Sequence, residues 1–239
     1  MNILIVNDDG YGARGIETLK RFLAPYGNIY IIAPDHQRSG ASHSFTYKGP
    51  FHLIKQKENE YTLDALPVDC VRLAKALNVK FDLVFSGIND GLNLGTDVLY
   101  SGTVGAAREA IIEGIPSIAI STDMNSFEIV ESELKNILKL VFEKKLYSKD
   151  YVLNINFPTK DFKKSVGIKV AKVGKKIFDA KIIEILDGYD IAGEFVTLDT
   201  DKATDVYLSL KGYTTLVPVG FDETNYLGID DLKNKLGGD

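Results

Sequence analysis

Two kinds of apolar pattern alternate through the first 125 residues, and this alternation constrains the fold more than any other feature. Short continuous apolar runs, typical of buried strands, are separated by segments whose apolar residues recur at helical spacing. This order predicts an α/β fold, with a Rossmann-like, mostly parallel sheet and helices on both faces. The expected strands are 2–6, 28–34, 81–87 and 116–121, and the expected helices are 15–26, 67–77, 103–114 and 126–146.

The second part of the chain has a different pattern. After an expected strand at 151–158, residues 160–219 hold short strand-like runs without helical segments between them. We predict a single domain over 1–239, in which 1–158 form a wound core with the candidate site loops. Residues 159–239 would form a β-rich extension, either a second lobe or arms for oligomer contact. The remaining expected elements are a hairpin at 46–63, strands at 167–173, 181–186, 193–198 and 213–219, and a C-terminal helix at 230–239.

Composition narrows the classes of partner. The chain of 239 residues is 45% apolar, enough for one large core, and its net charge of −5 does not favour duplex nucleic acid. No apolar stretch reaches the roughly 18 residues that cross a bilayer, and the amino end enters a strand without a basic leader. We therefore expect a cytoplasmic protein with no membrane partner. The only cysteine, Cys70, has no intrachain disulfide partner and is expected to be buried in its helix.

Polar residues gather where the expected strands end. NDDG follows the first strand, DHQRSGASHS the second, and INDGLNLGTDVLYSGT the third. Ligands of open parallel sheets bind outside the carboxyl ends of the strands, so these loops predict a shared site. Four residues in them offer only oxygen donors, which suit a hard cation such as Mg²⁺, Mn²⁺ or Ca²⁺. These candidate ligands are Asp8, Asp9, Ser39 and Asn89.

The adjacent acids Asp8 and Asp9 have two other interpretations. A turn in which acids cap the following helix accounts for them as well. A phospho-acceptor aspartate at a strand end, as in receiver domains, is the second alternative. That function needs a lysine at a later strand end, and none follows the runs at 81–87 or 116–121.

The stretch YSGTVGAAREA places Ser101, Gly102 and Thr103 at the start of an Ala-rich helix. A serine or threonine in this position caps the helix, and the free N–H groups with the helix dipole also favour a bound phosphate. His43 lies four residues past Ser39. It is either a solvated loop histidine or a group that faces a phosphate from a folded-back loop.

Taken together, these motifs make the sequence similar to the SurE family of survival-protein nucleotidases. The matching stretches are ILIVNDDG, IAPDHQRSGASHS, LPVDCVRLA, FDLVFSGINDGLNLGTDVLYSGTVGAAREA, GIPSIAIS, LNINFP and TDVYLSLKGYTTLVPV, which span nearly the whole chain. The resemblance implies a metal-dependent phosphatase that acts on nucleoside 5′- or 3′-monophosphates and, in some members, on short polyphosphate. It also implies dimers or tetramers formed through the C-terminal half. It assigns metal binding to Asp8, Asp9, Ser39 and Asn89.

One stretch departs from that family. Where the family usually has Gly-Thr-Pro before its Asp-Cys pair, this chain has Ala65 and Leu66 ahead of Pro67. The departure bears on the preference for base or sugar, because that loop is placed to touch the nucleoside.

The resulting hypothesis is a 5′-nucleotidase that hydrolyses nucleoside monophosphates with a metal-activated water. One divalent cation per subunit, Mg²⁺ or Mn²⁺, is expected on the four oxygen ligands. Asp8 or Asp9 is the first choice of general base and His43 the second, with direct attack of Asp8 on phosphorus as a further option. The alternatives are a non-catalytic mononucleotide-binding protein and a receiver-like phospho-acceptor. The residues expected to hold the phosphate are Asn93, Ser101, Gly102, Thr103 and His43.

Overall fold

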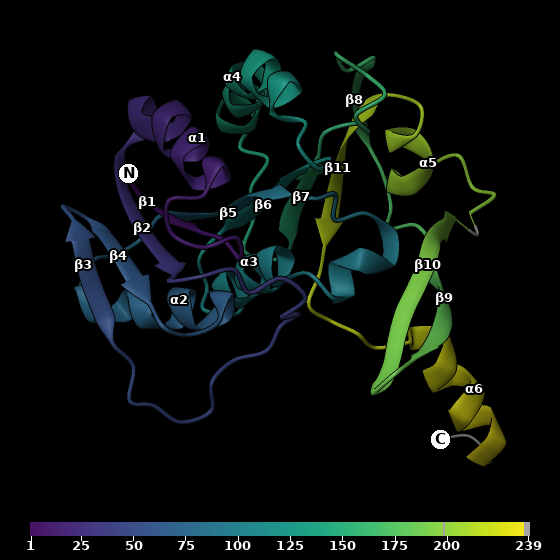
Figure 1. Ribbon diagram of the computed structural model, residues 1–239. Coiled ribbons are helices and arrows are strands. Elements are labelled where there is room, and N and C mark those ends of the chain that lie inside the picture. Colours follow the sequence, from purple (N-terminus) through teal and green to yellow (C-terminus); the bar gives the residue numbers. More distant parts are fainter. Residues whose placement is uncertain (198, 237–239) are drawn as a thin grey trace.

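A nine-stranded sheet forms the centre of the molecule, which the computed structural model describes over residues 1–197 and 199–236 (Figure 1). Its strands are β1 (Asn2–Val6), β2 (Asn28–Pro34), β3 (Leu53–Lys57), β4 (Glu60–Leu63), β5 (Leu83–Asp90), β6 (Ser117–Thr122), β7 (Val152–Asn156), β8 (Gly167–Val170) and β11 (Tyr213–Val219). The order across the sheet is β3-β4-β2-β1-β5-β6-β7-β11-β8. Neighbours from β4 to β7 are parallel, as are β11 and β8, whereas β3 with β4 and β11 with β7 are antiparallel. The predicted mostly parallel sheet is confirmed.

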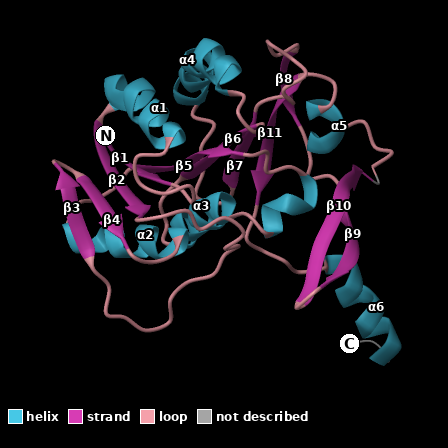
Figure 2. Ribbon diagram, in the orientation of Figure 1, coloured by secondary structure: helices cyan, strands magenta, loops and turns pink. Residues whose placement is uncertain are grey.

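Helices cover both faces of this sheet (Figure 2). Alternate residues of a strand point to opposite faces, so the central strand β1 contributes to two cores. Ile3 and Ile5 belong to the core with α1 and α4, whereas Leu4 and Val6 belong to the core with α2 and α3. The α-helices are α1 (Arg14–Leu23), α2 (Pro67–Leu73), α3 (Gly102–Ile112), α4 (Phe127–Lys144), α5 (Asp205–Ser209) and α6 (Tyr226–Leu236), with 3₁₀ turns η1 (Ala24–Tyr26), η2 (Ala74–Leu77) and η3 (Gly95–Leu99).

The wound half follows the sequence prediction closely. The segment expected as one helix at 67–77 divides into α2 and the 3₁₀ turn η2, and Cys70 in α2 is fully buried as predicted. The hairpin expected at 46–63 is confirmed as the shorter pair β3 and β4, and β4 joins the sheet beside β2. No helix in the described part of the chain combines the length and apolarity that crossing a bilayer requires.

The C-terminal half contributes to two different β structures. Strand β11 continues the main sheet beyond β7, and β8 forms its edge, so part of this half belongs to the same sheet as the wound core. Strands β9 (Lys176–Ile185) and β10 (Gly188–Thr197) form a separate antiparallel hairpin. Residue 198 of the strand expected at 193–198 and residues 237–239 of the expected last helix lie outside the described residues. The predicted arrangement, a single domain with a wound core over 1–158 and an extension over 159–239, stays a prediction.

The β9–β10 hairpin stands clear of the main sheet, with α6 beyond it (Figure 1). Nearly every residue of both strands is exposed, including several large apolar side chains. Helix α6 has no buried residue either. The exposed apolar side chains of the hairpin are Ile177, Phe178, Ile182, Ile183, Ile185, Leu186, Tyr189, Ile191 and Phe195.

Candidate active site

The four predicted ligands line one cleft of about 790 Å³ at the carboxyl edge of the main sheet. Asp8 and Asp9 follow β1, Ser39 lies in the loop after β2, and Asn89 lies at the end of β5. Of the residues predicted to hold phosphate, Asn93 and Ser101 line the same cleft. The lining does not include Gly102, Thr103 or His43.

The chain reverses direction at the end of β1 through a side-chain turn. The Asn7 amide donates to the Gly10 carbonyl oxygen at 3.0 Å, and the Gly10 N–H donates back to Asn7 Oδ1 at 3.2 Å. Gly10 has a φ of +98°, a backbone conformation that a glycine adopts without the steric cost of a Cβ. The turn holds Asp8 and Asp9 at the edge of the sheet, which explains why a buried strand ends in two acids.

Asp8 is the more deeply held of the two acids. Its side chain is buried, and its Oδ1 accepts a hydrogen bond from the Thr103 hydroxyl. Burial raises the pKa of Asp8, and the backbone N–H groups of Gly102 and Thr103 oppose that rise. The Asp8 carbonyl oxygen also accepts the Arg38 N–H at 2.7 Å, which ties the loop after β2 to this acid.

Asp9 is only partly buried, and two effects disfavour its charge. Burial and the neighbouring Asp8 raise its pKa to about 6, while the backbone N–H of Asp90, 3.3 Å from Asp9 Oδ2, opposes the rise. A carboxylate pair in this state is poised to accept positive charge, because a bound cation relieves both the desolvation and the repulsion.

Ser39 and Asn89 add neutral oxygen atoms to the cleft. The Asn89 amide nitrogen donates to the Gly91 carbonyl at 2.7 Å, which commits that nitrogen to the backbone and leaves Oδ1 as the free end of the side chain. Ser39 is exposed, and its hydroxyl oxygen accepts from Gln37 at 3.0 Å. Two carboxylates, a hydroxyl and an amide oxygen form a donor set suited to a hard divalent cation.

Asn93 is fixed by two asparagines of the neighbouring strand β7. Its backbone N–H donates to Asn156 Oδ1 at 2.8 Å, and its carbonyl oxygen accepts from the amides of Asn154 and Asn156 at 3.0 and 3.1 Å. Its own amide nitrogen donates to Ser121 Oγ at 2.8 Å. The amide nitrogen carries two hydrogens, so one of them is free for a ligand.

The start of α3 combines a helix cap with an acidic neighbour. Ser101 is the N-cap, and its hydroxyl oxygen accepts the Val104 N–H at 3.0 Å. Gly102 packs against Asp8 so closely that an added Cβ would lie 3.0 Å from the Asp8 carboxylate. The predicted cap is therefore present, and the first helical residues face Asp8. Phosphate binding by Ser101, Gly102 and Thr103 stays a prediction.

His43 lies against α3, with its Nε2 2.9 Å from Glu109 Oε2. The loop that carries it packs tightly on this helix, since a Cβ on Gly105 would meet the Ser42 carbonyl oxygen at 2.3 Å. The His43–Glu109 contact anchors the segment that follows Ser39. The predicted phosphate and proton-transfer roles of His43 stay predictions.

Sequence reasoning missed an entire wall of the cleft. Lys176, Phe178 and Phe195, at the base of the β9–β10 hairpin, line it together with Tyr100. It also missed Asn154 and Asn156 of β7, for which a signal was present: asparagines at alternate positions of an otherwise apolar strand. No local sequence pattern marks the hairpin residues as part of the site, because they reach it only through the tertiary fold.

A second acidic group lies outside the cleft. Oxygen and nitrogen atoms of Asp35, His36 and Asp64 lie within 4.8 Å of one another, a spacing that a metal ion could bridge. All three are exposed, and Arg38 already neutralises the group through a 2.8 Å contact with Asp64. A guanidinium among the carboxylates competes with a cation, so the cleft at Asp8 and Asp9 is the stronger candidate.

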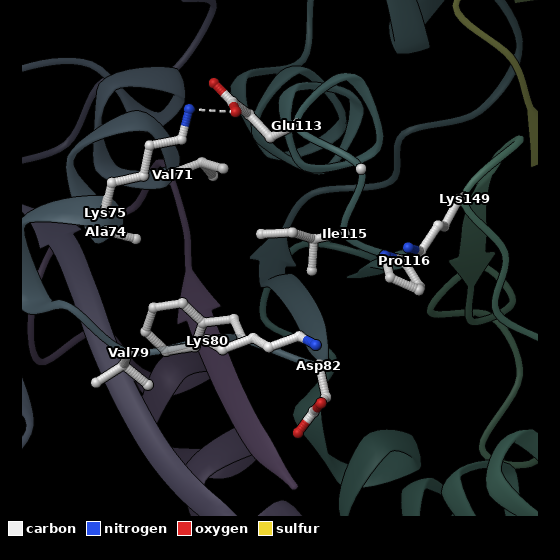
Figure 3. A pocket seen from close by; sticks show the side chains of 12 residues that line it. Val71, Ala74, Lys75, Val79, Lys80, Asp82, Glu113, Ile115, Pro116 and Lys149 are labelled. Atoms are coloured by element: carbon white, nitrogen blue, oxygen red, sulfur yellow. Dashed lines mark ion pairs between the residues drawn. The ribbon is translucent and has the colours of Figure 1, made fainter.

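A second hollow, of about 470 Å³, lies at the opposite edge of the sheet, next to the amino ends of β5 and β6 (Figure 3). Val71, Val79 and Ile115 line it, and its polar groups include the ion pair between Lys75 and Glu113. Its lining lacks a cluster of free oxygen donors. The oxygen donors gather instead in the cleft at the carboxyl edge.

A doubly wound α/β sheet with an oxygen-rich cleft at its carboxyl edge defines a class of ligand-binding and phosphate-processing proteins. Comparison with known proteins gives the family within that class. Residues 3–180 match the family model described as "Survival protein SurE". This chain belongs to the SurE family, as its motifs predicted.

Individual relatives agree with this assignment. The chain is 40% identical to "5'-nucleotidase SurE" of Clostridium botulinum (strain Loch Maree / Type A3) over 95% of both chains. It is 39% identical to the protein of the same name from Thermoanaerobacter sp. (strain X514) over 98% of both. The crystal structure of the SurE protein from Aquifex aeolicus superposes with a TM-score of 0.85 at 37% identity, covering 99% of this chain and 100% of that one.

Proposed function

We propose that this protein is a metal-dependent 5′-nucleotidase, which hydrolyses a nucleoside 5′-monophosphate to nucleoside and phosphate. The observation that carries the proposal is the convergence of Asp8, Asp9, Ser39 and Asn89 on one cleft. The name of the relatives at about 40% identity supports the same activity.

The negative charge of the cleft supports the proposal that a cation binds there. Its lining holds five carboxylates and, among the described residues, a single ammonium group, that of Lys176. A phosphate dianion would be repelled by such a lining unless positive charge were added. The donor set fits one divalent cation per subunit, Mg²⁺ or Mn²⁺, held by Asp8, Asp9, Ser39 and Asn89. When bound, such a cation supplies Lewis acidity, which withdraws charge from the phosphoryl group and acidifies water.

The surrounding residues have separate tasks in this proposal. Thr103 fixes Asp8 in one orientation through its hydroxyl group. Asn93 offers the free hydrogen of its amide to a phosphate oxygen, and Ser101 lines the cleft beside it. Asp9, the more exposed of the two acids, is the proposed general base.

Chelator treatment and one pair of variants test the proposal. Purified protein should release phosphate from AMP, lose this activity in EDTA and regain it with Mg²⁺ or Mn²⁺. Asp8→Asn should reduce turnover roughly a thousandfold, because the ligand charge is lost. Asp64→Asn, in the exposed acidic group, is the matched control and should leave turnover within twofold. Full activity in EDTA, or in Asp8→Asn, would contradict the scheme.

Direct attack of Asp8 on phosphorus is tested separately. Rapid acid quenching during turnover should trap no phosphorylated protein if water is the nucleophile. A phosphoprotein that disappears in Asp8→Asn would replace the water mechanism by a covalent one.

Finer properties follow the same proposal. We extend it to nucleoside 3′-monophosphates and short polyphosphate, to a cytoplasmic location and to a homodimer or homotetramer. The exposed apolar side chains of the hairpin and of α6 support assembly, since contiguous exposed apolar surface is unusual in monomers. A panel of 5′-nucleotides, 3′-nucleotides and polyphosphate, together with sedimentation, measures each of these properties.

A further inference from the structure

The lining of the candidate active-site cleft combines two chemically different kinds of side chain. Acids and neutral oxygens follow β1, β2 and β5, and the base of the β9–β10 hairpin adds apolar side chains and Lys176. The proposed cation and phosphate account for the acidic part only. The exposed apolar side chains of the lining are Tyr100, Met124, Ile177, Phe178 and Phe195.

The base of the β9–β10 hairpin is firmly attached to the rim of the site. Lys176 forms an ion pair with Asp97 at 2.5 Å, and its carbonyl oxygen accepts the Thr96 hydroxyl. The buried Asp205 accepts the Gly95 N–H at 3.0 Å and the Gly174 N–H at 2.8 Å. These contacts join the start of β9 to the loop that follows Asn89 and Asn93, although the two segments are about eighty residues apart (Thr96 and Lys176 are separated by 80).

The two aromatic rings at this base have a fixed arrangement. Phe178 and Phe195 are directly paired across the hairpin, with ring centroids 5.2 Å apart and planes tilted by 58°. A Cβ on Gly193 would lie 2.3 Å from the Asp179 carbonyl oxygen and 3.0 Å from the Phe178 ring, so the absence of a side chain there makes room for both the partner strand and that ring. The Lys176 ammonium lies 4.0 Å from the centroid of Phe195 and holds this ring from one side. Even so, 42% of Phe178 and 60% of Phe195 remain exposed.

We infer that Phe178 and Phe195 form the surface on which the nucleobase of the substrate rests. The inference depends on the proposed nucleotidase function, which places the phosphate at the acidic part of the same cleft. A nucleotide is a dianion joined to a flat aromatic base, and the same cleft is lined both by acids that suit a cation and by two partly exposed aromatic rings. Stacking on an aromatic side chain contributes to base binding without hydrogen-bond readout.

A comparison of AMP with ribose 5-phosphate tests this assignment, since the two share phosphate and ribose and differ in the base. The wild-type protein should show a lower KM for AMP. The double variant Phe178→Ala with Phe195→Ala should raise the KM for AMP roughly tenfold, leave kcat unchanged and leave ribose 5-phosphate within twofold. Tyr189→Ala is the matched control, since it removes an aromatic ring from the same hairpin outside the cleft.

The outcomes separate the two proposals. If wild-type protein hydrolyses neither compound with Mg²⁺ or Mn²⁺, the proposed function is wrong. If it hydrolyses both with equal KM, or if the double variant changes both equally, the rings do not hold the base. A change of sedimentation coefficient without a change in the ratio of the two KM values would assign the rings to subunit contact instead and overturn the inference.

Discussion

The main sheet and the β9–β10 hairpin are both β structures, but they are stabilised in different ways. Every residue of β6 is buried, whereas nine of the ten residues of β10 are exposed. Strands of the sheet exchange hydrogen bonds and bury side chains under helices of the same chain. The two strands of the hairpin form hydrogen bonds with each other, and their apolar side chains remain exposed. The difference teaches that strands of similar apolar content can stabilise the core when helices cover them and can remain free for a ligand, as we propose for the hairpin, when nothing covers them.

Core truncation should show the largest contrast between the two regions. Phe85 in β5 is fully buried between the sheet and its helices, so Phe85→Ala should lower the free energy of unfolding by about 3 to 5 kcal/mol. Tyr189→Ala in the hairpin is the counterpart and should change it by about 0.5 kcal/mol or less. Urea unfolding measures both values. Equal losses would show that the hairpin is packed as tightly as the sheet.

The buried acids of the packed region make the free energy of unfolding depend on pH. The pKa of Asp9 is about 6 in the folded protein, whereas it is 3.8 for a carboxyl group exposed to water, as in the unfolded chain. Between these two pH values the folded state therefore binds more protons than the unfolded state. In EDTA, raising the pH from 4 to 6.5 should therefore lower the contribution of Asp9 to the free energy of unfolding. Allowing for solvent screening, the expected loss is about 1 to 2 kcal/mol.

Unfolding of metal-free protein at several pH values tests this sign. Asp9→Asn should remove part of the decline, and the remainder belongs to Asp8, whose pKa burial also raises. Asp190→Asn, on the exposed hairpin, is the control and should leave the slope unchanged. Stability that rises with pH in wild-type protein and not in Asp9→Asn would contradict the assignment.

Adding a single methyl group at a glycine distinguishes the tightly packed site from the edge of the sheet. In Gly102→Ala the new Cβ would lie 3.0 Å from the Asp8 carboxylate, and displacement of that side chain by a few tenths of an ångström should lower turnover of AMP about tenfold. Gly167→Ala in the edge strand β8, where the nearest atom is 3.8 Å away, should have no effect on turnover. Initial rates with AMP, compared at equal thermal stability, separate the two cases.

Sequence reasoning captured the packed region because its signals are local. Continuous apolar runs mark the buried strands, and NDDG marks the point where β1 stops. The hairpin was predicted only as two shorter strands, since charged residues interrupt the apolar pattern on both sides of it. The hairpin reaches the cleft because Asp205 accepts hydrogen bonds from both Gly95 and Gly174. These contacts join distant segments, and no local pattern encodes them. The five-residue helix α5, which carries Asp205, was missed for the same reason.

The burial of the only thiol makes its reactivity a measure of local opening in the protein core. Cys70 is fully enclosed by α2 and the sheet, and burial raises its pKa well above the ordinary value. A thiol reagent can reach it only when α2 separates from the sheet, so its rate of labelling reports how often that opening occurs under native conditions. Labelling of Cys70 thus measures local opening of the wound core. It does not report on motions of the hairpin, which contains no cysteine.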